Sequence, residues 1–240
     1  MAITLYELQG AKDIRFSPYA WRAKLALAHK GLAPDEIVPV KFTEKDKIAF
    51  SGQGRTPILV DGDKTVPDSW AIACYLEDAY PDRPSLFGGE TGQGLAKFVN
   101  AYADGVLLGG IARQILWDVF QNVDPVDRDY FRETRQGRFG KTIEEIRDNR
   151  AGERPAWEAI LTPLRATLKA QPFLSGEAPT YADYIVMGTF MWPRCTSAYP
   201  LLPQGDDPVR AWRERMLDLH AGLCRAAVGY EEDFGLAESA

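Results

Sequence analysis

The chain has 240 residues, of which 45% are hydrophobic and 26% charged, a globular composition that suffices for two domains. No segment approaches the roughly 18 consecutive apolar residues that would cross a bilayer, so we expect no membrane partner. The formal net charge of −6 argues against a nucleic-acid partner. The first residues show neither a basic leader nor a cleavage site, and the three cysteines fit no disulfide framework, which predicts a cytoplasmic protein.

The first third of the chain alternates short strands with helices. Residues 3–8 (ITLYEL) predict a strand, and residues 37–40 predict a second one. Between them Ser17 and Pro18 open a helix, with a hydroxyl at the N-cap and proline at the first helical position, and Gly31 ends it. Apolar residues recur in this helix at helical spacing and predict one buried stripe: Trp21, Leu25 and Ala28.

A charged loop is expected over residues 43–55, and a hairpin follows it. An apolar run is followed by Asp61 and Gly62, which are a strong turn signal, and the chain returns as a second strand at Thr65 and Val66. Another helix starts at residues 68–69, and the proline-rich segment 80–84 ends it as a linker. This order of elements predicts a thioredoxin-like α/β unit with helices packed on a mixed sheet.

Beyond about residue 95 the pattern is helical only. Long amphipathic stretches over residues 106–120, 157–168 and 210–223, and another that begins at Thr180, predict helices. Residues 130–150 are the least assignable part of the chain. We therefore expect an α/β N-terminal domain over residues 1–84, followed by an all-α C-terminal domain over residues 92–240.

Ser17 has two interpretations. It can simply cap the helix that Pro18 begins, because Ser-Pro helix starts are common. Alternatively, its hydroxyl lies where a thioredoxin-like unit places its reactive sulfur, at a helix N-terminus that favours an anion. A serine there can donate a hydrogen bond to the thiolate of a bound cofactor and so lower the pKa of that thiol.

Two other segments could bind an extended peptide. Thr56 and Pro57 stand at the entrance to a strand, where a cis proline leaves the backbone of the preceding residue free to bond an antiparallel peptide. Asp68 and Ser69 stand at a helix start, where N–H groups and a hydroxyl can hold a carboxylate. Each pair alone also has a plain structural interpretation, as an edge-strand proline and as helix capping.

The order and spacing of these three sites resemble the N-terminal domain of glutathione transferases. Residues 17–22 (SPYAWR) and 50–57 (FSGQGRTP) are similar to motifs of the bacterial β-etherase class and its fungal etherase-like relatives. The resemblance implies a thioredoxin-like glutathione-binding domain followed by a helical domain for the acceptor substrate. It also implies glutathione as the co-substrate, and a homodimer.

Carried over position by position, the resemblance assigns the site residues. It implies that Ser17 hydrogen-bonds the glutathione sulfur and that Thr56 binds the cysteinyl backbone, with Pro57 in the cis form. It also implies that the γ-glutamyl end and the glycyl end of glutathione are held by further residues: Asp68 and Ser69 for the former, Gln53 for the latter.

The second domain carries an independent match to the same family. Thr180 and Asp183 have the spacing of a capping box, with aspartate in place of the usual Glu or Gln. Glutathione transferases carry such a box at the start of a buried helix of the helical domain. With it, the resemblance covers almost the whole chain.

Other sites are not favoured. The histidines, His29 and His220, are too few for a histidine-bearing metal cluster, so no metal is expected, and His29 is predicted to bond the terminal carbonyls of its helix. Tyr6 lies near the place where some glutathione transferases keep an activating tyrosine, but we expect it to pack. Cys74 falls within an apolar helix and is predicted to be an inert core thiol.

The function that these residues favour is attack by the glutathione thiolate on a hydrophobic electrophile, preferably an aromatic one. A narrower version is the reductive cleavage of β-aryl ethers. The acceptor is expected between the domains, facing Ser17, with walls from Tyr19 and residues 106–120. Trp117 could stack on it or serve the core. The alternative function is a non-catalytic carrier of hydrophobic ligands.

Overall fold

The computed structural model describes residues 2–230 and begins with a four-stranded mixed sheet. Its strands are β1 (Ile3–Leu8), β2 (Glu36–Val40), β3 (Ile58–Asp61) and β4 (Lys64–Pro67), in the spatial order β2-β1-β3-β4. β1 runs parallel to β2, whereas β3 is antiparallel to both β1 and β4. The predicted strands, hairpin and mixed sheet are therefore confirmed.

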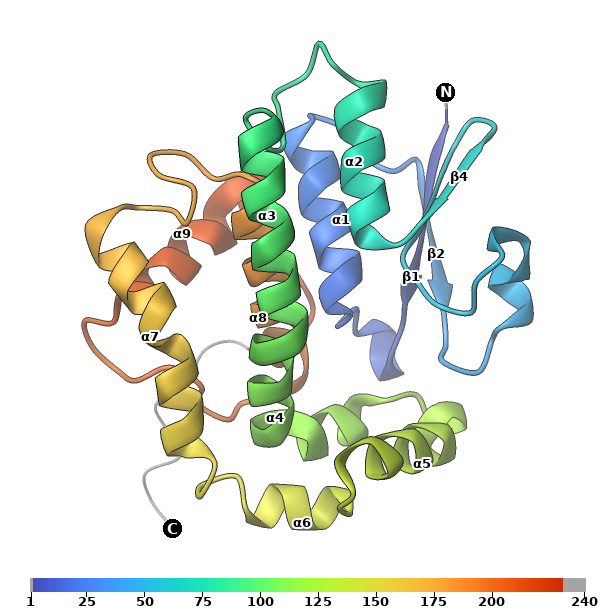
Figure 1. Cartoon of the computed structure of the whole chain (residues 1–240). Coiled ribbons are helices and arrows are strands. Elements are labelled where there is room, and N and C mark those ends of the chain that lie inside the picture. Colours follow the sequence, from blue (N-terminus) through green and yellow to red (C-terminus); the bar gives the residue numbers. More distant parts are fainter. Residues whose placement is uncertain (1, 231–240) are drawn as a thin grey trace.

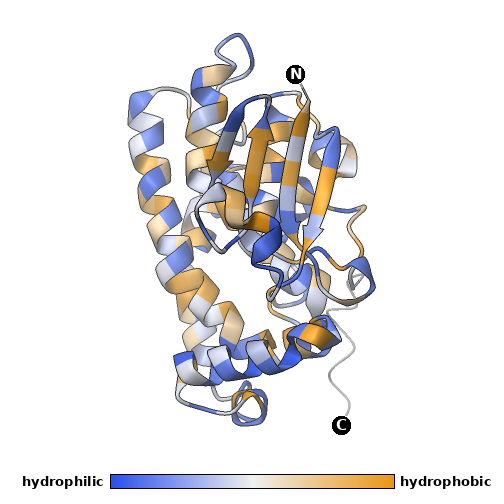
Figure 2. Ribbon diagram, turned by 90° about the vertical axis from the view of Figure 1, so that its right-hand side faces the viewer, coloured by the Kyte–Doolittle hydropathy of each residue, from blue (hydrophilic) through white to orange (hydrophobic). Residues whose placement is uncertain are grey.

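Helices cover both faces of this sheet. α1 (Pro18–His29) and α2 (Ser69–Ala79) lie side by side on one face (Figure 1). A 3-10 helix over Asp46–Ser51, within the segment predicted as a loop, covers the opposite face (Figure 2). Its Ile48 packs against Val40 and Ile58 in a small second core, so this apolar residue anchors the segment to the sheet.

The rest of the described chain is helical, apart from one isolated bridge between Phe173 and Gly176. The elements are α3 (Glu90–Tyr102), a π-helical turn (Ala103–Leu107), α4 (Leu108–Asn122), α5 (Arg128–Phe139), α6 (Ile143–Asp148), α7 (Arg154–Ala170), α8 (Tyr181–Thr196) and α9 (Pro208–Gly222). Short 3-10 turns add Ala11–Asp13 and Pro125–Asp127. Within residues 2–230 no helix combines the length and apolar character needed to span a bilayer.

The α/β unit followed by an all-helical part matches the predicted fold class. The central helix expected over residues 106–120 in fact continues from α3, through the π turn, into α4. A π turn shifts the helical register of the apolar residues, which explains why the pattern suggested a later start. α5 and α6 occupy most of the stretch from 130 to 150 that the sequence left unassigned.

α1 is buried on nearly all sides, so the prediction of a single buried stripe was wrong. Every residue from Ala20 to Leu27 is buried, because α8 crosses α1 on the side away from the sheet. Gly188 of α8 permits this close approach. A Cβ atom there would lie 2.6 Å from the carbonyl oxygen of Pro18 and 2.8 Å from Cγ of Arg22.

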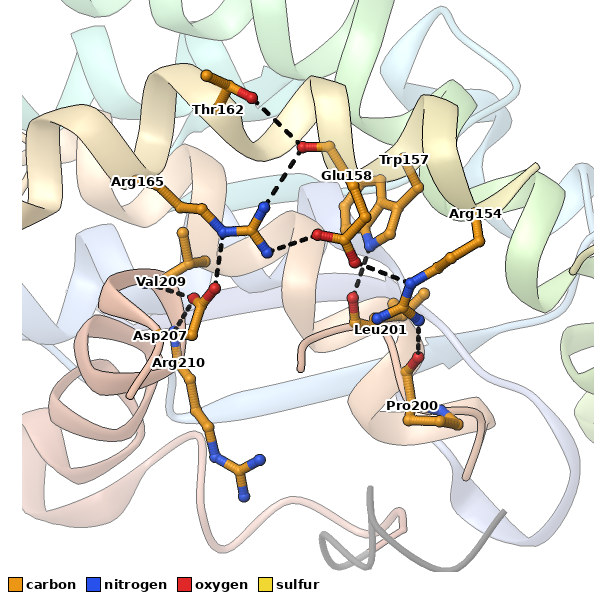
Figure 3. Close-up of polar contacts among 10 residues, drawn as sticks. All are labelled: Arg154, Trp157, Glu158, Thr162, Arg165, Pro200, Leu201, Asp207, Val209 and Arg210. Carbon is orange, nitrogen blue, oxygen red and sulfur yellow. Dashed lines mark hydrogen bonds and ion pairs between the residues drawn. The ribbon is translucent and has the colours of Figure 1, made fainter. Parts of the chain in front are cut away.

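An ion pair joins α7 to the start of α9, and a second one lies within α7 (Figure 3). The Arg165 guanidinium contacts Asp207 and Glu158, each at 2.7 Å. Asp207 in turn accepts hydrogen bonds from the backbone N–H groups of Val209 (2.8 Å) and Arg210 (3.1 Å). One carboxylate therefore caps α9 and also ties it to α7, which orders the outer layer of the helical part.

Candidate active site

The sheet topology gathers three of the predicted sites at one edge. β1 and β4 both end there, and β3 begins there, because Tyr6 pairs with Ile58 and Ile58 pairs with Pro67. α1 and α2 each start shortly after a strand that ends at this edge, so both N-termini lie at the lower end of the sheet in Figure 1. The residues around positions 17, 56 and 68 are consequently neighbours in the fold.

Ser17 is the N-cap of α1. Its Oγ accepts a hydrogen bond from the N–H of Ala20 at 3.3 Å, and the residue is 5% exposed. Among residues 2–230 its hydroxyl donates to no other group. Ser17 therefore caps the helix as the sequence predicts, and it also retains a hydroxyl proton at the positive end of the α1 dipole.

The Thr56–Pro57 peptide bond is cis, as expected. The carbonyl of Pro57 accepts from the N–H of Asp68 at 3.2 Å, so the bond at the start of β3 is fixed against the start of α2. The backbone N–H and carbonyl of Thr56 make no backbone hydrogen bond to another described residue. Thr56 thus keeps a free donor and a free acceptor at the end of a strand.

Asp68 is the N-cap of α2 and has a strained backbone, with φ of 77°. Its Oδ1 accepts from the N–H groups of Trp70 (2.9 Å) and Ala71 (3.1 Å). Ser69 is buried, and its carbonyl accepts from the Tyr181 hydroxyl at 2.7 Å. A non-glycine residue at positive φ costs about 1–3 kcal/mol and is concentrated at ligand sites; here it holds the exposed Asp68 carboxylate at the edge.

Gln53 lies three residues before Thr56 on the loop that follows the 3-10 helix. Gly52, with φ of 73°, reverses the chain, and the Gln53 N–H donates to the Ser51 hydroxyl at 3.4 Å. The Gln53 side chain is half-buried and makes no hydrogen bond within the described residues. The backbone of the loop therefore positions Gln53, and the side-chain amide of Gln53 makes no hydrogen bond to a described residue that would hold it.

Tyr6 packs on the opposite face of the sheet. It lies beside Val40, Ile48 and Ile58 in the second core, and its ring centroid is 5.1 Å from that of Phe50. Leu5, its neighbour in β1, faces the main core under α1. Side chains alternate along a strand, so the prediction that Tyr6 packs is confirmed.

A buried polar group beside Ser17 was missed by the sequence reasoning. Arg22 is fully buried; it contacts Asp104 of the π turn at 2.9 Å and bonds Asn100 (3.2 Å) and Thr189 (3.3 Å). Its guanidinium also lies 4.8 Å from the ring centroid of Tyr19. The available signal was an arginine among apolar helix positions, which demands a buried partner.

Tyr19 lies one helical residue beyond Pro18 and is half-buried. Burial, and next the Asp104 carboxylate, raise the pKa of its hydroxyl, although Arg22, Arg138 and Arg55 act in the opposite direction. Its hydroxyl is therefore protonated near neutral pH. The two last arginines come from α5 and from the loop before β3, which places both close to the start of α1.

Several other predicted residues have structural partners. Trp117 is half-buried and its ring carries the Arg147 guanidinium at 4.6 Å. Cys74 is half-buried, not fully in the core, and burial raises its pKa. His29 bonds the Tyr184 hydroxyl (2.7 Å) and the Ser85 carbonyl (2.9 Å), so its predicted role at its own helix end was wrong.

A pocket of about 260 Å³ opens elsewhere, beside the middle of α1. Its lining residues are Glu7, Asp13, Arg15, Trp21, Lys24, Ile37, Ala227 and Val228. None of these is a predicted site residue. In the part of the chain that the structure describes, no three His, Cys, Asp or Glu side chains gather as metal ligands.

With this geometry in view, comparisons with solved structures define the class of protein. A glutathione S-transferase of Ceriporiopsis subvermispora, solved in complex with glutathione, superimposes with a TM-score of 0.71 at 25% identity. The match covers 81% of this chain and 85% of that one. Over the part of the chain that this match covers, the fold is therefore that of the glutathione S-transferases.

Sequence comparisons identify the family. Residues 16–79 match the family model "Glutathione S-transferase, N-terminal domain", and residues 94–200 match "Glutathione S-transferase, C-terminal domain". A probable glutathione transferase of Aplysia californica is 38% identical over 32% of this chain and 83% of its own length. The chain belongs to the glutathione S-transferase family.

A fungal relative extends the sequence match only in part. The glutathione S-transferase-like protein ustS of Aspergillus flavus is 34% identical over 140 residues, which are 52% of this chain. The match spans about half of that relative, 49% of its length.

Proposed function

We propose that this protein is a glutathione transferase in which the Ser17 hydroxyl donates a hydrogen bond to the thiolate of bound glutathione. The observation that carries the proposal is the buried Ser17 hydroxyl at the N-terminus of α1, whose proton has no acceptor among residues 2–230. Hydrogen bonding to a charged form lowers the pKa of the group. The thiol of about pKa 8.5 would thereby ionise near neutral pH.

The reaction follows from a stabilised thiolate. Ionisation releases the thiol proton to solvent; the sulfur then forms a bond to an electrophilic carbon, and the leaving group departs with its electron pair. Ser17 stays protonated throughout and acts as a donor, not as a base. Rate gain comes from the thiolate fraction and from holding the two reactants together.

The remaining edge residues fit the peptide part of glutathione. The free N–H and carbonyl of Thr56 suit the cysteinyl backbone in the antiparallel manner of an added strand. Oδ2 of Asp68 makes no hydrogen bond to a described residue and suits the γ-glutamyl ammonium, while the Ser69 hydroxyl and the α2 N-terminus suit its carboxylate. The unbonded amide of Gln53 suits the glycyl end.

The acceptor that we propose is a hydrophobic, aromatic compound. A narrower version is a β-aryl ether, whose carbon would take the sulfur while an aryloxide leaves with the electrons of the broken C–O bond. It rests on the similarity of residues 17–22 and 50–57 to etherase motifs. Release of phenol from a model β-aryl ether, measured with and without glutathione, tests the β-aryl ether proposal. Turnover of aryl halides without turnover of the ether would contradict that proposal.

Ultraviolet titration tests the role of Ser17. Bound glutathione thiolate is followed by its absorbance against pH in wild type and in the Ser17→Ala variant. The thiol is expected to ionise about one unit or more below the free thiol in wild type only. Tyr6→Phe is the matched control, because that hydroxyl lies on the other face of the sheet. An equal pKa in wild type and Ser17→Ala would reduce Ser17 to a cap.

The Ser17→Ala variant also distinguishes the transferase function from the alternative function. If the protein is a non-catalytic carrier of hydrophobic ligands, Ser17→Ala leaves ligand affinity intact and wild type shows no conjugation above the uncatalysed rate. If it is a transferase, conjugation falls in Ser17→Ala while ligand affinity is retained. We propose the cytoplasm as its location, since all three cysteines are unpaired.

We also propose a homodimer that uses α3. Leu95 and Phe98 lie three residues apart on that helix and are 65% and 72% exposed. Light scattering is expected to give twice the chain mass for wild type and the single mass for Leu95→Lys/Phe98→Lys. Val126→Lys, a change at another exposed apolar residue, is the control. A monomeric wild type would contradict the proposal.

A further inference from the structure

Aromatic rings and cations gather between the start of α1 and α5. Phe16, which precedes Ser17, has its ring centroid 6.2 Å from that of Phe42, and Phe42 lies 5.8 Å from Phe131 of α5. The Arg135 guanidinium lies 5.2 Å from the Phe42 ring and 4.6 Å from the Phe131 ring. The ring contacts therefore connect Phe16, the residue next to Ser17, with Arg135 of the helical part.

Further cations lie near Arg135. Arg138 follows it by three residues on the same face of α5, and Nζ of Lys45 lies 5.6 Å from the ring centroid of Tyr130 on that helix. Burial, and next the neighbouring Arg138, lower the pKa of Arg135, and Arg55 adds to this effect against the opposing Tyr130. Lys45 lies near the same group: burial, and then Arg55, lower its pKa. Its ammonium donates to the Gly54 carbonyl at 2.7 Å. We call Lys45, Arg55, Arg135 and Arg138 the cationic cluster.

The cluster forms no ion pair within the described part of the chain, although the Asp127 carboxylate opposes the lowering of the Lys45 pKa by burial. Arg135 donates to the Thr134 hydroxyl, and no carboxylate within 4.0 Å pairs with any of the four cations among residues 2–230. The nearby Asp127 carboxylate accepts three hydrogen bonds, from both Phe42 and Thr43. Like charges that gather without a counter-ion are costly unless an anion binds there.

The position of the cluster relates it to Ser17. Arg55 immediately precedes the cis Thr56–Pro57 bond, and both Arg55 and Arg138 act electrostatically on Tyr19, two residues after Ser17. α5 lies across the end of the sheet at which α1 begins (Figures 1 and 2). An acceptor at the start of α1 would meet the half-buried rings of Tyr19 and Phe42 and, next to them, guanidinium groups.

We propose that Arg135 and Arg138 of α5 bind an anionic group, a carboxylate in the first instance, of the aromatic acceptor. The inference rests on the proposed transferase function and narrows its substrate class to anionic aromatic electrophiles. Guanidinium groups match carboxylates in a two-point geometry, and their planar faces stack on rings. The carboxylate of glutathione's own glycyl end is the competing source of negative charge.

A matched pair of acceptors tests the proposal. 4-Chloro-3,5-dinitrobenzoate and its methyl ester both undergo displacement of chloride by the thiolate, with one S–C bond formed and one C–Cl bond broken. Each kcat/KM is divided by the uncatalysed rate constant to remove the intrinsic difference in reactivity. Wild type is expected to favour the acid by about tenfold or more, as for a hydrogen bond to a charged group.

Variants assign the preference to α5. Arg135→Gln/Arg138→Gln is expected to lose the preference for the acid and to leave both the ester rate and the KM for glutathione unchanged. Arg132→Gln is the control: it removes the same charge from the same helix, but its guanidinium is already paired with Glu144 at 2.9 Å. An unchanged acid-to-ester ratio in the double variant overturns the proposal. So does a raised glutathione KM with both acceptors, which would assign the cluster to the glycyl end.

A binding arm separates this inference from the proposed function. Calorimetry measures 3,5-dinitrobenzoate and its methyl ester against wild type and the double variant, without any reaction. If conjugation is absent but the acid binds about tenfold more tightly through the two arginines, the anion site stands and the transferase proposal fails. Equal affinity for acid and ester in wild type removes the anion site, whatever the protein catalyses.

Discussion

At the scale of single residues, Arg22 is a buried charge whose partners connect α1 to the helical part, while its Nε has no hydrogen-bond partner among the described residues. Its guanidinium is removed from water, and its partners come from three elements: Asn100 of α3, Asp104 of the π turn and Thr189 of α8. A buried ion contributes to stability only if such partners satisfy it. Asp104 also acts on Tyr19, so the same ion pair links the fold to the candidate site.

Arg22→Met is expected to destabilise the protein by about 2–3 kcal/mol, below the usual range for a broken buried pair because Asp104 is 36% exposed. Urea unfolding measures the loss. The double variant Arg22→Met/Asp104→Leu should recover part of it, since no carboxylate is then left unpaired. Equal stability of the single and double variants would show that the ion pair contributes nothing beyond the arginine's packing.

At the scale of elements, the contact between α1 and α8 holds the start of α1 in place. Gly188 lies against the Pro18 carbonyl, one residue after Ser17, and against the Arg22 side chain. α8 is itself fixed by its capping box, in which the Thr180 hydroxyl and the Asp183 carboxylate satisfy backbone N–H groups at its N-terminus. The Trp212 indole also donates to Asp183 at 2.9 Å, which joins α9 to the start of α8.

Gly188→Ala is expected to lower stability by about 1–3 kcal/mol, because the added methyl group overlaps backbone atoms of α1 and the helices must separate. It should also reduce thiolate stabilisation by moving Ser17. Thermal unfolding and the thiolate titration measure the two effects. Gly105→Ala is the control, since a Cβ there has no atom within 4 Å; the same loss in both variants would exclude the overlap as the cause.

At the scale of the whole molecule, three side chains join the α/β unit to the helical part. His29 of α1 contacts the Tyr184 hydroxyl of α8 at 2.7 Å, and that hydroxyl contacts Nε2 of His220 in α9 at 3.1 Å. Nε2 of His29 must carry its proton, because its partner is the Ser85 carbonyl. Neutral His29 then accepts from Tyr184 through Nδ1, and His220 donates to Tyr184 through Nε2, so protonating Nδ1 of His29 removes the acceptor of the Tyr184 proton.

Stability is therefore expected to fall as pH drops below about 6.5, the ordinary histidine pKa. Burial first lowers the pKa of both rings; Lys30 acts in the same direction on His29, and His29 does so on His220. The unfolded chain consequently binds more protons than the folded one in this range, and unfolding is favoured by acid. The hydrogen bond to the Ser85 carbonyl, and to a smaller extent Glu77, oppose the lowering of the His29 pKa.

Tm measured from pH 8 to pH 5 tests this dependence in wild type and in His29→Gln/His220→Gln. The double variant is expected to be less stable at pH 8 but to lose less on acidification. Tyr184→Phe keeps both histidines, so its Tm should depend on pH more strongly than that of the double variant. Parallel profiles for wild type and the double variant would assign acid sensitivity to other groups.

Local chemistry made much of this protein predictable from its sequence. Ser17 and Pro18 specify the start of α1, Asp61 and Gly62 specify the hairpin, and Thr180 and Asp183 specify the start of α8, because each signal acts over a few residues. A local signal of the same kind located the cap at Asp68, whereas the cis bond before Pro57 was expected from the family resemblance. The role of these residues toward glutathione remains a proposal.

Other features depended on contacts between distant segments, which a local pattern does not encode. The burial of α1 on all sides required α8, and the packing of Tyr6 away from α1 required the register of β1. The two histidines met through Tyr184, about 155 positions from one of them. Residues 130–150 gave no clear pattern, because charged side chains dominate α5, and only the tertiary structure brought Arg135 and Arg138 toward the start of α1. The sequence by itself determined the elements and their caps; long-range packing decided which of their side chains meet.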